Sequence, residues 1–177
     1  MQTVAVPPSD AELQQWFNAI DVDRTGTITA AELQRAMALG NLHFSLMACA
    51  QMVKLHDRDN SGCIGLGEFR SLHMQLTEIR VAFAAAAQGG DAISQQQVEQ
   101  LVQQQGYRLE PPALKALCSS FDPDRNGRFG LPEYTMLCLF LTASRNIFSA
   151  FDAQRTGRVS LDFSQARAFV YAAAQTR

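Results

Sequence analysis

The sequence is poor in several features that would assign it to a common class of protein. Only 2 of its 15 basic residues are lysine, the arginines are scattered and the net charge is −2, so it has no basic field for nucleic acid. Its most apolar run, MLCLFL at 136–141, is far shorter than the roughly 18 residues that span a bilayer. We therefore expect no nucleic-acid binding, and we interpret the apolar run as core or as a surface for a partner.

Paired cysteines and a catalytic constellation are also missing. The four cysteines show no paired spacing and no charged and apolar leader precedes them, so we expect reduced thiols of an intracellular protein and no disulfides. Cys49 and Cys118, on predicted helix faces, are expected to be small core residues. The three histidines form no recognisable nucleophile and base arrangement with the cysteines. The sequence therefore predicts a protein that is not an enzyme.

Carboxylates, in contrast, are concentrated in short segments. In DVDRTGTITAAE, residues 21–32, Asp21, Asp23 and Glu32 would repel one another without a counter-ion. Offsets 1, 3, 5, 7 and 12 of this segment offer side-chain or backbone oxygens, and Gly26 stands at offset 6, where the chain must turn sharply. Because Ca²⁺ prefers such oxygens, the segment has the pattern of an EF-hand calcium loop. A polar turn between two helices is the alternative that one copy leaves open.

The pattern recurs, which favours the calcium loop over the polar turn. DRDNSGCIGLGE at 57–68 and DPDRNGRFGLPE at 122–133 keep the acidic offsets and the glycine. DAQRTGRVSLDF at 152–163 has Gln154 and Phe163 where two ligands should be. The predicted metal ligands are Asp21, Asp23, Thr25, Thr27, Glu32, Asp57, Asp59, Ser61, Cys63, Glu68, Asp122, Asp124, Asn126, Arg128 and Glu133, with Thr27, Cys63 and Arg128 contributing backbone carbonyls.

A fifth copy is expected in the long gap between the loops that start at 57 and 122. AAQGGDAISQQQ at 86–97 fits there, with alanine and glutamine where ligands should be, so we expect this third hand to bind no metal. If Phe83 rather than Ala82 is the packing residue, this loop is one residue shorter. Offset 8 is apolar in every copy, and we expect it to lie in a very short strand that pairs with the same strand of a neighbouring loop. These residues are Ile28, Ile64, Ile93, Phe129 and Val159.

The intervals between the loops predict an all-α fold of five EF-hands on about eight helices. Residues 69–85 and 134–151 are each predicted to form one long helix shared by consecutive hands, because neither segment contains a helix stop. Residues 1–8 are expected to be a short flexible N-terminus, and 9–177 one domain. Helix starts are indicated by the Ser/Thr-x-x-Glu spacing of a capping box, at Ser9 with Glu12 and at Thr29 with Glu32. Trp16, beside the first loop, is expected to be a core residue.

These motifs resemble the penta-EF-hand family, which includes sorcin, grancalcin, peflin, the calpain small subunit and the apoptosis-linked calcium adaptors. The resemblance rests on the five loops, the two shared helices and GYRL at 106–109, and it covers nearly all of 9–177. The full twelve-residue first loop is most similar to the apoptosis-linked and peflin branch. The chain departs from the family in its third hand, often a strong site in relatives, and in having only Pro7-Pro8 in place of a long Gly/Pro-rich tail.

The loops and the resemblance together imply an intracellular calcium sensor and adaptor that binds Ca²⁺ in the first, second and fourth hands, changes conformation and binds a protein or peptide. Two alternatives stay open: a calcium-binding regulatory subunit of a calpain-like protease, and a calcium buffer. We expect a cytoplasmic location, with membrane association only indirect or dependent on calcium.

An odd number of hands leaves one loop strand without an internal partner, and an unpaired edge invites another chain. The resemblance implies a homodimer, or a heterodimer with another penta-EF-hand chain, through the fifth hand. A C-terminal helix folded onto its own core is the alternative. The expected interface residues are Val159, Phe163, Phe169, Val170 and Tyr171.

Overall fold

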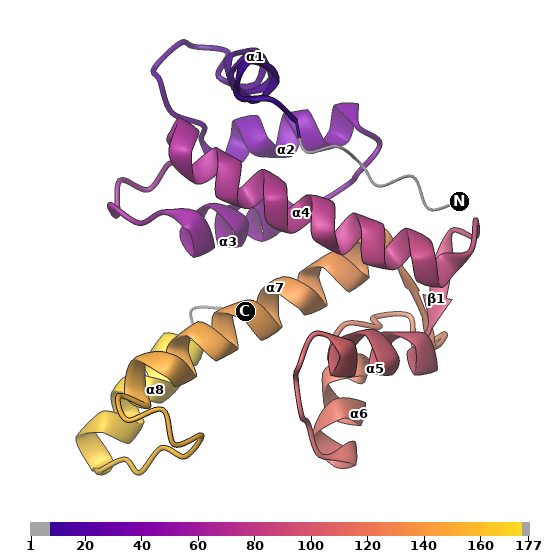
Figure 1. Ribbon diagram of the computed structural model, residues 1–177, viewed down its shortest axis with the longest axis vertical. Helices are drawn as coiled ribbons and strands as arrows, with labels where there is room; N and C mark the ends of the chain where they lie inside the picture. The colour runs from indigo at the N-terminus through magenta and orange to yellow at the C-terminus, as the bar shows by residue number, and fades with distance from the viewer. Residues whose placement is uncertain (1–7, 175–177) are drawn as a thin grey trace. The chain divides into compact units, whose positions relative to one another are not determined.

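Eight α-helices and two short strands make up the part of the chain that the computed structural model describes, residues 8–174, with side chains up to residue 170 (Figure 1). The contacts divide the chain into two compact units, Met1–Gln75 and Leu76–Arg177. In chain order the elements are α1 (Asp10–Ile20), α2 (Ala30–Leu39), α3 (Leu46–His56), α4 (Leu66–Ala87), β1 (Ala92–Ser94), α5 (Gln95–Gln104), α6 (Pro111–Ser120), β2 (Arg128–Gly130), α7 (Leu131–Phe151) and α8 (Phe163–Ala174).

The first unit holds two helix–loop–helix hands, α1 with α2 and α3 with the start of α4. Both predicted capping boxes are confirmed. The Ser9 side chain accepts the Glu12 N–H, and the Glu12 carboxylate accepts the Ser9 N–H at 2.8 Å; Thr29 and Glu32 form the same reciprocal pair. Each box satisfies two N–H groups that a helix start leaves without a partner, and so fixes where α1 and α2 begin.

The loops of this unit meet at one backbone bridge. Ile28 and Ile64 pair in antiparallel orientation, and both side chains are fully buried.

On α1 the buried face is centred on Leu13 and Phe17. The prediction for Trp16 is wrong: its side chain is 42% exposed, because it lies at the edge of that face and not at its centre.

The second unit is built around a two-stranded antiparallel sheet. Strand β1 of the third hand pairs with β2 of the fourth, with Ile93 opposite Phe129 and both side chains buried. Both expected loop pairings, first with second and third with fourth, are thus confirmed. The glutamine-rich stretch forms α5, whose buried side chains are Val98 and Val102. The core of this unit contains Ile79, Phe83, Ile93, Val98, Val102, Leu114, Leu117, Cys118, Phe129, Tyr134, Leu137, Cys138 and Leu141.

The predicted all-α fold on eight helices is confirmed for the described residues, as are the two long helices, which are α4 and α7. The third loop begins later than the predicted residue 86, because α4 continues through Ala87. Phe83 is buried and Ala82 only partly so, which agrees with the shorter of the two alternatives for this loop. A single domain over 9–177 stays a prediction, and residues 1–7 lie outside the described part.

Candidate metal centres

The first loop is closed by hydrogen bonds from its backbone to Asp21, the residue that follows α1. Asp21 Oδ1 accepts the Thr25 N–H at 3.0 Å, and Oδ2 accepts the Gly26 N–H at 2.9 Å. Gly26 has φ of 81°, a left-handed conformation that glycine adopts at little cost. The loop therefore turns back over the Asp21 carboxylate, as the calcium-loop pattern requires.

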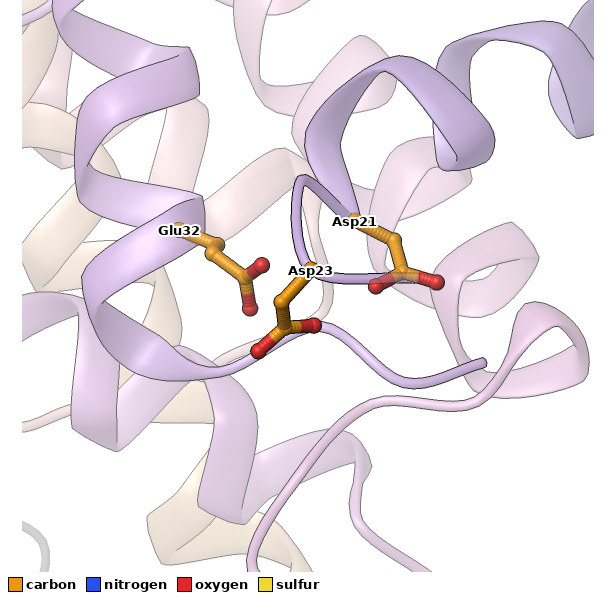
Figure 2. A group of neighbouring side chains, drawn as sticks. All are labelled: Asp21, Asp23 and Glu32. Carbon is orange, nitrogen blue, oxygen red and sulfur yellow. The ribbon is translucent and has the colours of Figure 1, made fainter. Parts of the chain in front are cut away.

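Glu32, in the first turn of α2, closes the other end of this loop. Its Oε1 accepts the Val22 N–H at 3.1 Å, a bond that spans ten residues and ties the start of the loop to its end. Figure 2 shows Asp21 at the end of one helix, Asp23 on the loop and Glu32 on the next helix. One carboxylate oxygen from each of the three lies within 4.8 Å of the others.

Neutral oxygens complete the donor set of the first loop. The Thr25 hydroxyl lies 3.4 Å from Asp21 Oδ1 and 3.2 Å from the Thr27 carbonyl oxygen. Offsets 1, 5 and 7 therefore converge, and offsets 3 and 12 join them through the carboxylate cluster. All of these are hard oxygen donors without a thiolate or an imidazole among them, which fits Ca²⁺.

Hydrogen bonds keep these carboxylates ionised. Burial by itself raises the pKa of Asp21, but the N–H groups of Gly26 and Thr25 outweigh it, so that the pKa lies below the ordinary 3.8. For Glu32 the bonds from the Thr29 N–H and hydroxyl lower the pKa below the ordinary 4.5. Two carboxylates that resist protonation, close to a third, produce a field that attracts a dication.

The second loop assembles in the same way. Asp57 accepts the N–H groups of offsets 5 and 6 at 3.0 and 2.9 Å. Glu68 accepts the Arg58 N–H at 2.7 Å and the Gly65 N–H at 2.8 Å. Oxygens of Asp57, Asp59 and Glu68 again lie within 4.8 Å of one another, and the offset-5 hydroxyl donates to the offset-7 carbonyl at 3.3 Å. The second predicted site is therefore brought together by the fold.

The fourth loop has the same donors but gathers them less closely. Asp122 accepts the N–H groups of offsets 5 and 6 at 3.1 and 2.9 Å, as in the other loops. Offset 2 is Pro123, which has no N–H, so the bond that ties the first two loops shut cannot form here. Glu133 accepts the Gly130 N–H at 2.6 Å, and its carboxylate does not reach the mutual spacing with Asp122 and Asp124 that the first two clusters show. The sequence analysis did not predict this difference, because offset 2 is not a ligand position.

The fifth loop folds like a calcium loop without its full ligand set. Asp152 accepts the Thr156 N–H at 2.9 Å and the Gly157 N–H at 2.7 Å. Offset 3 is Gln154 and offset 12 is Phe163, so only one of the three carboxylate positions is acidic. This loop presents no cluster that fits a divalent cation.

The predicted dimer residues fall into different environments. Phe163 is 87% exposed and Val170 is exposed on α8. Val159 is half-buried and, within residues 8–174, pairs with no other loop strand. Phe169 packs edge-to-face on Phe151 of α7 at 5.5 Å, where α8 lies against the end of α7 (Figure 1). The side chain of Tyr171 lies outside the described part of the chain.

The third loop differs from the others in its backbone. Gln88 and Gly89 are consecutive left-handed residues, whereas each of the other four loops places left-handed residues at offsets 4 and 6. Gln97 stands where the metal loops have glutamate. Its Oε1 accepts the Ser94 N–H at 2.8 Å, and its Nε2 donates to the Ala86 carbonyl at 2.7 Å. Sequence reasoning missed this second bond, although the Ser-x-x-Gln spacing already indicated the capping box around it.

Comparisons with known proteins agree with this geometry. A family model described as an EF-hand domain pair matches residues 10–74, the first two hands. Peflin of Danio rerio is 28% identical over 162 residues, which are 89% of this chain and 60% of that protein. Penta-EF hand domain-containing protein 2 of Dictyostelium discoideum is 26% identical over 87% of this chain and 75% of that protein. A solved structure of a homolog of programmed cell death 6 protein from Leishmania major Friedlin shares the fold with a TM-score of 0.71 and 29% identity, over 93% of this chain and 95% of that one. These likenesses, over most of the chain, support its resemblance to the penta-EF-hand family.

The EF-hand match to the first two hands indicates Ca²⁺ as the ion, and the donor sets of these two loops fit it. When bound, Ca²⁺ supplies the positive charge that the clustered carboxylates lack. The chain spans 60% of the length of the peflin it matches, and neither relative's name denotes an enzyme. Within the described residues, no helix is both long and apolar enough to cross a membrane.

Proposed function

We propose that this protein is a calcium sensor and adaptor that binds Ca²⁺ in its first, second and fourth hands, changes conformation and then binds a partner protein or peptide. The convergence of three carboxylates within 4.8 Å in each of the first two loops carries the proposal. The fourth loop is included because its donor residues are complete, although they are held further apart.

The ligand charge supports a sensor. Each proposed site has three carboxylates, a number typical of loops with dissociation constants of about 10⁻⁷ to 10⁻⁵ M. At about 100 times the dissociation constant, one site stabilises the bound conformation by about 2.7 kcal/mol. Two such sites reach the lower end of the roughly 5–15 kcal/mol that stabilises a whole domain. Calcium binding is therefore strong enough to change the angle between two packed helices.

Exposed apolar side chains support the adaptor role. Leu39, at the end of α2, and Leu46 and Met47, at the start of α3, are all exposed on either side of the connection between these helices. Leucine and methionine are side chains that adapt to apolar partners. We propose that calcium changes the exposure of these apolar side chains, so that partner binding depends on the ion.

We also propose a homodimer, or a heterodimer with another penta-EF-hand chain, through the fifth hand. Exposed Phe163 and Val170 support it, together with Val159, which pairs with no other loop strand among residues 8–174. Phe163→Asp should shift the sedimentation coefficient from that of a dimer to that of a monomer at tens of micromolar. Arg167→Asp, an exposed change on the same helix, is the control for added charge. A parent chain that sediments as a monomer with and without calcium would rule out this dimer.

A cytoplasmic location belongs to the same proposal, with membrane association only through calcium or through a partner. Free, buried cysteines support it, since Cys49, Cys118 and Cys138 are all unpaired thiols in the structure and a reducing compartment keeps them so. Fractionation of cells with and without a calcium chelator would test it: material that stays with membranes in chelator would contradict the proposal.

Calorimetric calcium titration tests the ion sites directly. The parent should bind three ions, and Glu32→Ala, Glu68→Ala and Glu133→Ala should each remove one, because the glutamate contributes two of the ligand oxygens. Glu78→Ala, an exposed change on α4 outside the loops, is the matched control for lost charge and should still bind three. Unchanged stoichiometry in all three loop variants would refute the sites. Calcium binding with no gain in the fluorescence of a hydrophobic dye would indicate a buffer and not a sensor.

A further inference from the structure

We propose that Gln97 is a positioning residue that closes the third hand without a metal, so that the fourth calcium loop is built on a partner that is formed with or without Ca²⁺. The inference rests on the proposed calcium binding by the fourth hand, and it adds a residue that is not a ligand to the determinants of that site. The first and second hands then differ from the third and fourth in that neither of the first two is closed by a neutral side chain.

The observation behind it is a bond between two helices. Gln97 lies in the first turn of α5, and its Nε2 donates to the carbonyl of Ala86 in the last turn of α4 at 2.7 Å. The last carbonyls of a helix have no partner within the helix. Through its Oε1, the same amide also accepts the N–H of Ser94, which precedes α5. One side chain therefore ties the end of the incoming helix to the start of the outgoing one.

An amide can donate to a helix carbonyl and a carboxylate cannot, so the glutamates of the first two loops tie their loops only by accepting the N–H at offset 2. Glu32 and Glu68, at the same offset in the first two loops, only accept hydrogen bonds, and both face the carboxylates at offsets 1 and 3. Those loops hold like charges together, which is unfavourable until a cation is present. Gln97 is neutral and has both a donor and an acceptor, so it closes its hand without any ion.

The closed third hand is continuous with the fourth loop. Ser94 pairs with Arg128 in the sheet, and the next residue, Gln95, donates its N–H to the Gly127 carbonyl at 3.1 Å. Gly127 is the turn residue whose N–H is bound by Asp122, and Arg128 provides the predicted carbonyl ligand at offset 7. A shift of Gln97 is therefore transmitted through backbone bonds to Gly127 and Arg128, two consecutive residues of the metal loop.

Two consequences follow for calcium binding. The sheet between the third and fourth hands should be formed in the absence of calcium, and the fourth site should bind its ion independently, since its partner loop has none. The first and second loops, both acidic and joined at Ile28 and Ile64, should instead influence each other's binding. The affinity of the fourth site should depend on Gln97, which touches no ion.

Amide hydrogen exchange by NMR, on the full chain in EDTA, tests the first consequence. The Gln95 N–H is the reporter, because it starts α5 and its bond to Gly127 crosses the sheet. Gln97→Glu keeps the acceptor for the Ser94 N–H but removes the donor to the Ala86 carbonyl. Its effect therefore reports the bond to α4 and not the cap of α5. Gln96→Ala changes an exposed glutamine in the same helical turn and is the matched control.

We expect the Gln95 amide of the parent to be protected in EDTA. Gln97→Glu should accelerate its exchange by about fivefold, the effect of losing one ordinary hydrogen bond, and Gln96→Ala should leave it unchanged. Exchange of Gln95 at the parent rate in Gln97→Glu, or an unprotected Gln95 amide in the parent in EDTA, would overturn the proposal. Gln97→Glu retains the capping box of α5, so the test does not depend on a variant that lacks this cap.

Calorimetry in a Glu32→Ala, Glu68→Ala background, where only the fourth loop keeps its ligands, tests the second consequence. Gln97→Glu should weaken calcium binding there by about two- to fivefold, while Gln96→Ala binds like the parent background. Equal affinity in Gln97→Glu and its background would overturn the positioning role. A background that binds no calcium would remove the fourth hand from the proposed function, and the exchange measured in EDTA would still decide whether Gln97 closes the third hand.

Discussion

Ile28 and Ile64 exchange two backbone hydrogen bonds, with N···O distances of 2.8 and 2.9 Å. Both residues stand at offset 8 of their loops, and both side chains are fully buried. Since each bond runs from one candidate calcium loop to the other, a shift of either backbone is transmitted to its partner. The bridge makes the first two hands one structural element.

Ile64→Ala should therefore affect both sites. Removing this buried side chain should lower the free energy of unfolding by about 2–5 kcal/mol, and calorimetry should show weaker calcium binding at the first loop as well as the second. Val159→Ala, at the same offset of the fifth loop but half-buried and without a bridge in the described residues, is the matched control and should cost much less. Loss of affinity at the second loop alone would contradict the coupling.

Two glycines of the second loop should respond to alanine in opposite directions. Gly62 has φ of 79°, so alanine there should be destabilising by about 1–2 kcal/mol although nothing lies within 4 Å of the added methyl group. Gly67 lies in the first turn of α4 without a positive φ and with the same free space, so alanine should stabilise the fold by about 0.4–1 kcal/mol. Urea denaturation in EDTA measures both. Changes of the same sign would show that backbone conformation does not set these costs.

The loops were predictable because their chemistry is local. The spacing of acidic residues and glycine within twelve residues fixes both the turn at Gly26 and the position of Glu32, and the capping box at Thr29 follows from the same short segment. The pairings of Ile28 with Ile64 and of Ile93 with Phe129 could also be predicted, because an apolar residue recurs at offset 8 in every copy.

Features that depend on side-chain direction were not predictable in this way. Helical spacing placed Trp16 on the apolar face of α1, but its ring lies at the edge of that face, 5.0 Å from the ring of His73. The donor from Gln97 to Ala86 joins residues eleven apart across a loop whose length the sequence left open. In the fourth loop, Pro123 has no N–H to donate to Glu133, and the carboxylates are less closely gathered than in the first two loops.

Thiol reactivity should distinguish one cysteine from the other three. Burial raises the pKa of Cys118 and of Cys138 to about 11, and burial also raises the pKa of Cys49. A raised pKa leaves less thiolate at neutral pH, and the thiolate is the reactive form. Only Cys63, which is partly exposed in the second loop, should react quickly with a disulfide reagent in the native protein. Cys63→Ser should abolish this fast phase, and a fast phase that persists would contradict the assignment.

Acid should destabilise the calcium-free protein through its loop carboxylates. The folded pKa of Asp21 lies below the ordinary 3.8, because the N–H bonds from Gly26 and Thr25 outweigh burial, which acts in the opposite direction. A carboxyl group whose pKa is lower in the folded state contributes stability above its unfolded pKa and loses it as the pH falls through the folded value. Urea midpoints in EDTA should thus decrease as the pH falls from about 5 to about 3, the range around that value.

Asp21→Asn should make this decrease shallower, because the asparagine amide does not titrate and the group no longer contributes to the linkage. Asp10→Asn is the matched control. Asp10 is an exposed aspartate at the start of α1, the helix that Asp21 follows. Its carboxylate pairs with Arg70 at the surface, at 3.0 Å, and a surface pair of this kind contributes little to stability. The control should therefore follow the parent curve. If Asp21→Asn and the parent lose stability equally across this range, the hydrogen bonds to Asp21 do not hold its carboxylate ionised, and the account of the first loop as a preformed anionic site fails with them.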